Sequence, residues 1–312
     1  MANTLEYSKI FQPVLDKQIA QESTTGWMEV NANQVKYNGG DEVKLPTILM
    51  DGLGDYDRGK GFVEGAVTVK WATYALTQDR GREFQLDSMD VDETNFVATA
   101  GSVMGEFQRT QVVPEIDAYR YSKIATLAKD AKNSRDLVVT STNILDELLQ
   151  DLTVLEDKIG AQQVIITLSP ITAGLLKKAA KDLITAQTFA QAGLNLNLSA
   201  FNENPLKTVT SKLLKSKYIF KDGSTSGQET GGFTPDASAQ DINWLLSTSD
   251  APIAVSKTDK VRVFDPATNQ KADAWKMDYR KYHDLWIPEN KLDKVYANLK
   301  TAETTPPEGS GD

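Results

Sequence analysis

The sequence of 312 residues has no cysteine and only one histidine, and these two shortages exclude several kinds of site. Without thiols there is no disulfide framework, no thiolate nucleophile and no cysteine-ligated metal, which is simplest for a protein that folds in a cytoplasm. The single histidine, His283, nearly excludes a histidine-based triad or a multi-histidine metal site. We therefore expect His283 to serve in packing or hydrogen bonding.

Long apolar runs are also missing, because no stretch approaches the ~20 consecutive apolar residues of a membrane span. The first residues, MANTLEYSKIF, lack the basic start and apolar run of a signal peptide, so we expect no membrane partner and no secretion. Basic charge is scarce too, and the net charge of −9 argues against a dedicated nucleic-acid binder. With 40% apolar residues the chain can still bury one large core or two modest ones.

Acidic residues are abundant in one segment. Residues 41–95 hold twelve acidic and six basic residues, and so carry −6 of the net charge of −9. This segment is either a solvated acidic face or a surface that meets a basic patch on a neighbouring molecule.

Residues 54–61 of this segment, GDYDRGKG, have the G-x-x-x-x-G-K spacing of a phosphate-binding loop. Gly61 stands beside Lys60 where a serine or threonine would hold magnesium, and strand-like sequence follows in place of a helix. Residues 90–95 have the acid spacing of a calcium loop but lack its glycine, so helix capping explains them better. We therefore expect no cofactor, no metal and no enzyme, and keep a soluble nucleotide-binding enzyme as the least favoured alternative.

A hairpin is predicted from Gln34 onward, and residues 45–87 are predicted to be mostly a long, two-faced ribbon. Apolar and polar residues alternate in VTVKWATYA, and Asp79–Gly81 predicts a tight turn after which Phe84 and Leu86 resume the alternation. A two-stranded ribbon is marginal in water unless something covers its apolar side. We therefore expect Trp71, Phe84 and Leu86 to need a partner surface that the local sequence does not supply.

A long helix is predicted to follow. Asp90 and Glu93 have the spacing of a capping box, and apolar residues then recur every three or four positions on both sides of Pro114. One helix from Glu93 to about Ala131 would be about 58 Å long at 1.5 Å per residue, with a kink near Pro114. Such a length is unusual for an ordinary enzyme domain.

Beyond Asn133 short helix and strand signals alternate, which is typical of a compact lobe of helices and strands. Helices are expected in TNILDELLQDLTVLEDKIG and in ITAGLLKKAAKDL, and strands in QVIITLS, KYIF, APIAVSK, KVRVFD and ADAWKMDYRKYHDLWIP. Residues 221–240 are expected to form a surface loop. The aromatic residues of WKMDYRKYHDLW could stack on nucleic-acid bases, but packing of a strand against the long helix is favoured.

The order of these parts resembles the major capsid proteins of tailed bacteriophages, of the type found in phages of Gram-positive hosts. The stretches that carry the resemblance are YDRGKGF, TYALTQDRGREFQLDSMDVDET, EFQRTQVVPEIDAYRYSKIA, QVIITLSPITAGLL and DYRKYHDLWIPENKLDKVYAN. It covers roughly residues 1–300 and includes no catalytic signature.

The resemblance implies an α+β fold of the Hong Kong 97 type. Its parts would be an N-terminal arm (1–44), an extended β-hairpin loop (45–88), a peripheral domain with the spine helix (89–132 and 256–300), an axial domain (133–255) and a disordered tail (301–312). In the family the extended loop lies across the neighbouring subunit. The inter-subunit contacts that this implies are Tyr56, Arg58, Lys60, Phe62, Trp71, Tyr74, Arg80, Arg82, Phe84 and Leu86.

The resemblance also implies a function, namely self-assembly into an icosahedral capsid of hexamers and pentamers that encloses double-stranded DNA. The protein would be made in the host cytoplasm and reside in the virion, with the DNA contacted non-specifically. Scaffolding and portal proteins would be its partners, with a separate scaffold or none in place of a fused one. Some relatives crosslink a lysine to an asparagine, but no such pair can be mapped, and Lys60 and Lys70 are candidates by location alone. An encapsulin-like nanocompartment shell with a protein cargo is the alternative.

Overall fold

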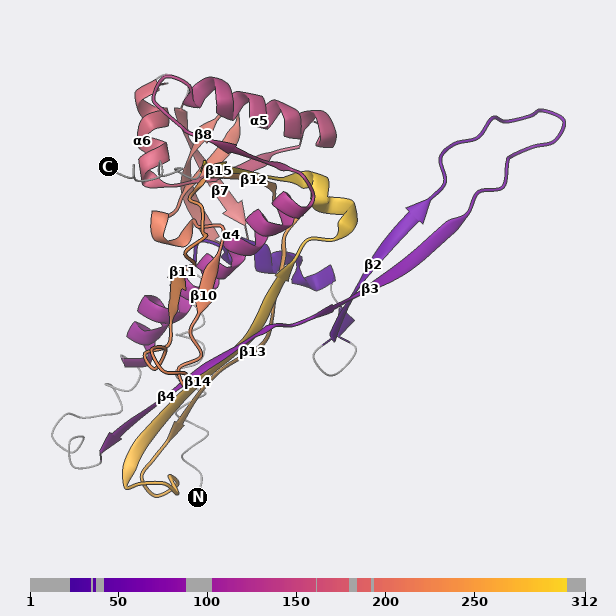
Figure 1. Ribbon diagram of the computed structural model, residues 1–312. Helices are drawn as coiled ribbons and strands as arrows, with labels where there is room; N and C mark the ends of the chain where they lie inside the picture. Colours follow the sequence, from indigo (N-terminus) through magenta and orange to yellow (C-terminus); the bar gives the residue numbers. More distant parts are fainter. Residues whose placement is uncertain are drawn as a thin grey trace, which may run out of the picture.

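A long helix runs through the body of the protein and packs against its seven-stranded sheet and against a three-stranded sheet (Figure 1). The computed structural model describes residues 23–34, 36–37, 42–87, 103–160, 162–179, 184–191 and 194–301. The helix is continuous over residues 103–130, where a π-helical turn, η2 (Gln108–Val112), leads into α4 (Val113–Asp130). Pro114 directly follows this π-helical turn, and since it has no N–H it cannot donate a hydrogen bond to the preceding turn of the continuous helix. The expected long helix is confirmed here, while its predicted start at Glu93 lies outside the described residues.

The larger sheet has seven strands in the order β5-β15-β12-β6-β9-β8-β7. Its central strands are buried on both faces, as shown by β12, where Trp244 and Leu246 face α5 (Ile144–Ile159) and Leu245 faces α4. This double burial explains the nearly continuous apolar run VIITL of β6 and the three consecutive apolar residues, Trp244 to Leu246, in the middle of β12. The strands are β5 (Ser134–Leu137), β6 (Val164–Leu168), β7 (Ile184–Gln191), β8 (Leu194–Phe201), β9 (Asn204–Thr208), β12 (Ile242–Thr248) and β15 (Val295–Lys300), and α6 (Pro170–Ala179) packs beside α5.

The second sheet has the order β13-β14-β4, with every pair antiparallel. It consists of β13 (Ile253–Phe264), β14 (Ala274–Trp286) and β4 (Gln78–Asp87). The turn predicted at Asp79–Gly81 is wrong, because these residues lie inside the continuous strand β4. Gly81 is needed there for a close approach, since a Cβ atom on it would lie 2.8 Å from the carbonyl oxygen of Tyr279 on β14.

A hairpin of β2 (Glu42–Met50) and β3 (Val67–Ala75) projects from the body, with β1 (Lys36–Tyr37) paired to its base (Figure 1). Residues 51–66, which we call the tip, connect the two long strands at the far end. The base of the hairpin is anchored in the body, where Val43 and Leu45 pack with Ile253 and Trp286. The predicted ribbon therefore consists of β2 and β3, while β4 belongs to the second sheet.

A smaller pair of strands, β10 (Tyr218–Phe220) and β11 (Phe233–Pro235), lies beside α4, so the predicted loop 221–240 includes one short strand. The remaining elements are 3₁₀ segments, η1 (Gly26–Gln34), η3 (Ser211–Leu213) and η4 (Glu289–Lys294). Residues 1–22, the capping acids at 90–93 and nearly all of the tail are outside the described part of the chain. The domain boundaries stay a prediction; β15, grouped with the peripheral segment, pairs in the seven-stranded sheet.

Candidate assembly surfaces

The far half of the projecting hairpin carries an unusual amount of exposed apolar surface. Leu53 is completely exposed and Phe62 is 88% exposed, whereas a soluble monomer normally shows such side chains singly. Even Trp71, nearer the body on β3, keeps 47% of its surface exposed. The exposed apolar residues of the hairpin are Met50, Leu53, Tyr56, Phe62, Val63, Val67, Val69 and Trp71.

The tip is nevertheless shaped by its own hydrogen bonds. The carboxylate of Asp57 accepts the backbone N–H groups of Gly59 (2.6 Å) and Lys60 (3.1 Å), and the N–H of Gly61 donates to the Asp57 carbonyl (2.7 Å). The rings of Tyr56 and Phe62 lie 4.9 Å apart, which closes the turn on its other side. GDYDRGKG is therefore a turn that precedes strand β3, and it lacks the helix that receives phosphate in a nucleotide-binding loop.

The predicted contact residues divide into two groups, those exposed on the hairpin and those that lie against the body of their own chain. Tyr56, Arg58, Lys60 and Phe62 lie on the tip, well exposed. Tyr74 lies at the base of the hairpin, where its ring stacks on that of Trp286 at 5.6 Å and where burial raises its pKa.

Phe84 and Leu86 belong to the second group of predicted contact residues, which lie against the body of their own chain and are partly buried there. Phe84 packs edge-on against Phe107 of the long helix, with ring centroids 4.9 Å apart, and both residues join a cluster around Met277. The expectation that these two side chains need a partner for cover is wrong. The reason is the pairing of β4 with β14, which turns this face of β4 toward the helix.

Arg80 and Arg82 bind the glycine-rich loop between β10 and β11, which we call loop 221–232. The guanidinium of Arg80 forms a bidentate ion pair with Glu115 of α4 (2.6 and 3.3 Å) and donates to the carbonyl of Lys221 (2.8 Å). Nη1 of Arg82 donates to the carbonyl of Glu229 (3.2 Å). Both arginines thus connect strand β4 to this loop within the same chain.

A cavity of about 550 Å³ lies between these elements. Its walls come from β4, β14, residues 107–116 of the long helix and loop 221–232. Its lining includes three aromatic residues, Phe84, Phe107 and Tyr279, together with several charged ones. The ionisable residues that line it are Asp79, Arg80, Arg82, Glu115, Lys221, Asp222, Lys281 and His283.

His283 is 3% exposed, and its ring packs edge-on against Tyr119 of α4 at 5.6 Å. Burial is the main cause that holds the pKa of His283 well below its usual value, and the nearby cations Arg120, Lys281 and Arg80 lower it further. The neighbouring Asp284 accepts hydrogen bonds from the Tyr119 hydroxyl (2.5 Å) and from Thr77. The predicted packing role of this histidine is confirmed, and so is the packing of its strand against the long helix.

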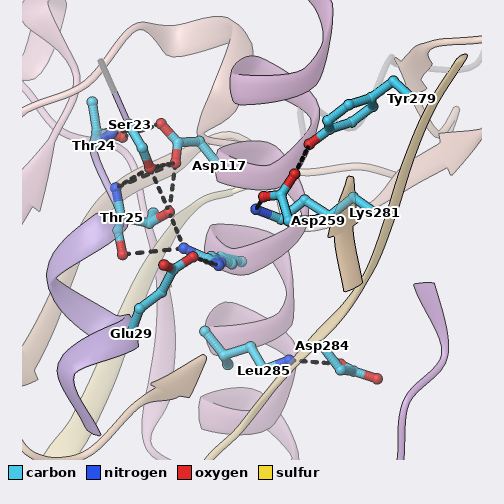
Figure 2. A network of polar contacts seen from close by, with 11 residues as sticks. Ser23, Thr24, Thr25, Glu29, Asp117, Asp259, Tyr279, Lys281, Asp284 and Leu285 are labelled. Carbon is cyan, nitrogen blue, oxygen red and sulfur yellow. Dashed lines mark hydrogen bonds and ion pairs between the residues drawn. The ribbon is translucent and has the colours of Figure 1, made fainter. Parts of the chain in front are cut away.

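Sequence reasoning missed a polar clamp on the long helix, formed by Asp117 with Ser23, Thr24 and Thr25 (Figure 2). Asp117 is 1% exposed, and its carboxylate accepts the hydroxyl groups of all three residues at 2.5–2.8 Å and two backbone N–H groups. One turn further along, the fully buried Arg120 pairs with Glu29 (2.5 Å). The sequence did carry a signal for this clamp, because Asp117 and Arg120 are charged residues three positions apart within the apolar pattern of the helix.

The clamp ties the first described residues to the centre of the molecule. Thr25 and Trp27 are buried, and Trp27 joins the core cluster that contains Ile124 of α4. The path of the chain from residue 23 onward is therefore fixed by the long helix. Among the described residues no group of three or more potential ligands could hold a metal ion, and no helix is long and apolar enough to cross a bilayer.

Comparison with known proteins defines the class of fold. No protein-family model matches the sequence, and no curated protein matches it either. Solved structures do match this chain in fold. The asymmetric unit of the mature capsid of bacteriophage PhiM1 aligns with a TM-score of 0.54 at 14% identity, over 86% of this chain and 84% of that one.

Two further structures give the same result. A protein of Gordonia phage Cozz aligns with a TM-score of 0.54 at 13% identity, over 88% of this chain and 87% of that one. A virus-like particle from Pyrococcus furiosus aligns with a TM-score of 0.51 at 10% identity, over 94% of this chain and 99% of that one. The chain therefore has the capsid-type fold that the resemblance predicts, that of Hong Kong 97.

Proposed function

We propose that this protein is the major capsid protein of a tailed bacteriophage, which self-assembles into an icosahedral shell of hexamers and pentamers around double-stranded DNA. The observation that carries the proposal is the projecting hairpin of β2 and β3, on which large apolar side chains such as Leu53, Phe62 and Val63 are mostly exposed. The likeness in fold to the PhiM1 capsid structure supports it.

The physical argument rests on the cost of leaving this surface in water. Burying apolar surface is favourable by about 25 cal/mol per Å². The side chains of Phe62 and Leu53 are large, and they lie on an element that Figure 1 shows projecting away from the seven-stranded sheet and from the sheet of β13, β14 and β4. A second copy of the chain is the simplest surface to cover them, and repetition of that contact by rotation gives closed rings.

The remaining parts of the proposal follow from a capsid role. The protein would act without cofactor or enzymatic activity, be made in the host cytoplasm and reside in the virion. Scaffolding and portal proteins would be further partners, and packaged DNA would be contacted without sequence preference. The division into arm, extended loop, peripheral domain and axial domain is also part of the proposal, and Lys60 and Lys70 would be the candidates if the subunits are crosslinked.

A nanocompartment shell with a protein cargo is the second candidate. It is supported by the alignment with the virus-like particle from Pyrococcus furiosus, which extends over 94% of this chain. The two candidates share the assembly step and differ in what the shell encloses.

Size-exclusion chromatography and electron microscopy of the purified protein test the proposal. Closed particles are expected, with and without a co-expressed scaffold. A strict monomer at every salt and protein concentration would contradict both candidates. The contents of the particle then separate them, because neighbouring terminase and portal genes and enclosed DNA indicate a capsid, while a neighbouring enzyme gene and enclosed protein indicate a nanocompartment.

A further inference from the structure

The cavity behind loop 221–232 is built on one face of the sheet of β13, β14 and β4. Arg80, Arg82 and Phe84 alternate along β4, so their side chains share one face of the sheet, and all three line the cavity. The strand register places Tyr279 of β14 directly opposite Arg82. The Cβ atoms of two such opposed residues lie about 5 Å apart. A cation and an aromatic ring are therefore neighbours in the lining.

The aromatic part of the lining is a connected cluster. Phe107 of the long helix packs edge-on against Phe84 at 4.9 Å and against Tyr279 at 6.1 Å. All three rings line the cavity. A ligand that contacts this cluster needs an apolar or aromatic group of its own.

The acidic groups of the lining are already engaged within the chain. Glu115 forms the bidentate ion pair with Arg80, and Asp79 accepts two hydrogen bonds from Arg280, at 2.8 and 2.5 Å. Asp222 accepts bonds from a hydroxyl and two backbone N–H groups of its own loop, which lower its pKa to about 2. Each carboxylate of the lining thus has its own donors.

Two cations of the lining, Arg82 and Lys221, have no such partner. Neither forms an ion pair with any residue that the structure describes, whereas Lys281 of the same lining pairs with Asp259 at 2.7 Å. Backbone hydrogen bonds are the main cause that lowers the pKa of Glu229, and Lys221 adds to the effect from beyond ion-pair distance. Arg82 donates one hydrogen bond, to the Glu229 carbonyl, and keeps its other N–H groups for a further acceptor. The cavity therefore presents positive charge that lacks a counter-charge in contact.

A buried polar atom without a partner lies in the same lining. His283 is 3% exposed, and its Nδ1 atom makes no hydrogen bond within the described part of the chain. Leaving such an atom unpaired is costly, so a group that enters the cavity gains by bonding to it. Four positions on β14 separate His283 from Tyr279, a distance of about 13 Å at ~3.3 Å per residue. A molecule that contacts both residues is elongated.

We infer that this cavity binds an elongated aromatic carboxylate, with the carboxylate paired to Arg82 and Lys221, the ring against the aromatic cluster and a polar group within reach of His283. The cavity volume of about 550 Å³ lies inside the range of ~300–1,000 Å³ that is typical of small-molecule sites. A free acid with two rings offers this chemistry, and so does a peptide that ends in an aromatic residue. The inference goes beyond the proposed function and holds for the subunit whether or not it assembles.

Loop 221–232 is a preformed wall of this site. Arg80 donates to the carbonyl of Lys221 and Arg82 to that of Glu229, so strand β4 holds the loop in place before any ligand arrives. Such preorganisation lowers the entropic cost of binding. A ligand that joins β4, the long helix and the loop binds the folded state alone, and it should therefore raise the melting temperature.

Calorimetric titration of the full-length protein tests the inference, with 4-benzoylbenzoate as the probe and the uncharged 4-benzoylbenzamide as its match. We expect the acid to bind at least about tenfold more tightly than the amide, because charge-assisted hydrogen bonds are stronger than neutral ones. Arg82→Gln and Lys221→Gln should each weaken binding of the acid and leave binding of the amide unchanged. The matched control, Lys178→Gln on α6, should bind both probes as the natural sequence does.

The titration has clear contrary outcomes. Equal affinity for acid and amide in the natural protein, or no heat with either probe, would overturn the inference. Retention of the full preference for the acid in both variants would overturn it as well. A variant that loses both probes has lost the cavity itself, and the other variant then decides.

Two tripeptides distinguish the sources of the ligand. Gly-Gly-Phe with a free carboxylate, compared with its amide, should show the same preference if the site receives the end of a protein chain. Binding of 4-benzoylbenzoate without binding of the tripeptide assigns the site to a free small molecule. Either result supports the inference.

Photolabelling locates the site without any substitution. On irradiation the ketone of 4-benzoylbenzoate adds across a nearby C–H bond, with no leaving group. Mass spectrometry should find the label on peptides that contain Phe84, Phe107 or Tyr279, and excess biphenyl-4-carboxylate should prevent it. Label confined to other parts of the chain would refute the inference and leave the proposed function untouched.

Discussion

The clamp around Asp117 leads to a quantitative prediction about stability. Replacement of Asp117 by alanine removes one buried carboxylate that serves Ser23, Thr24 and Thr25 together. Each hydrogen bond to a charged group contributes about 1.5–3 kcal/mol, and the donors left behind either stay buried without partners or pull their segment into water. We expect the free energy of unfolding to fall by about 3 kcal/mol, within the range of about 3–5 kcal/mol for breaking a buried charged network.

Urea titration of the unassembled subunit, followed by tryptophan fluorescence, measures this loss. Trp27 is 5% exposed and lies two residues beyond the clamp, so release of the segment should also shift its emission to the red before global unfolding. Asp117→Asn should cost less, because the amide oxygen still accepts. Asp157→Ala, an exposed acid on α5, is the matched control and should change stability by no more than about 0.5 kcal/mol. An Asp117→Ala protein as stable as this control would refute the reasoning.

Three further predictions concern the sheet and the tip. Burial holds the pKa of His283 well below its unfolded value near 6.5, so the contribution of the neutral ring to stability is complete above pH 6.5 and is lost as the pH falls. Because His283 is the only histidine, the melting temperature should decline less between pH 7.5 and 5 in His283→Gln than in the natural protein. Equal declines in the two proteins would contradict this. Phe84→Ala, in a partly buried side chain, should lower the free energy of unfolding by about 2–4 kcal/mol. Phe62→Ala, in an exposed side chain of the tip, should change that free energy by under about 0.5 kcal/mol and yet abolish assembly. Urea titration tests the two stabilities and electron microscopy tests the assembly. Gly81→Ala places a Cβ atom 2.8 Å from the Tyr279 carbonyl and should destabilise by about 1–3 kcal/mol in the same titration; an unchanged midpoint would show that β4 can move aside.

Several elements could be predicted from the sequence because the signals that specify them are local. The long helix follows from apolar residues at spacings of three and four, and α5 and β6 follow from their own periodicity. The exposed tip follows from a glycine-rich, charged stretch that offers no apolar period. Absence of cysteine and the single histidine limited the possible chemistry before any fold was known.

The tertiary structure decided which surfaces are covered. Phe84 and Trp71 belong to the same alternating pattern, yet β4 pairs with β14, about two hundred residues further along, and only Phe84 comes to lie under the long helix. Asp117 could not be assigned a partner either, because the three residues that donate hydrogen bonds to it lie more than ninety positions earlier in the chain. Periodicity records which side of a strand or helix is apolar. Which element covers that side depends on contacts between distant segments, and these form only when the whole chain folds.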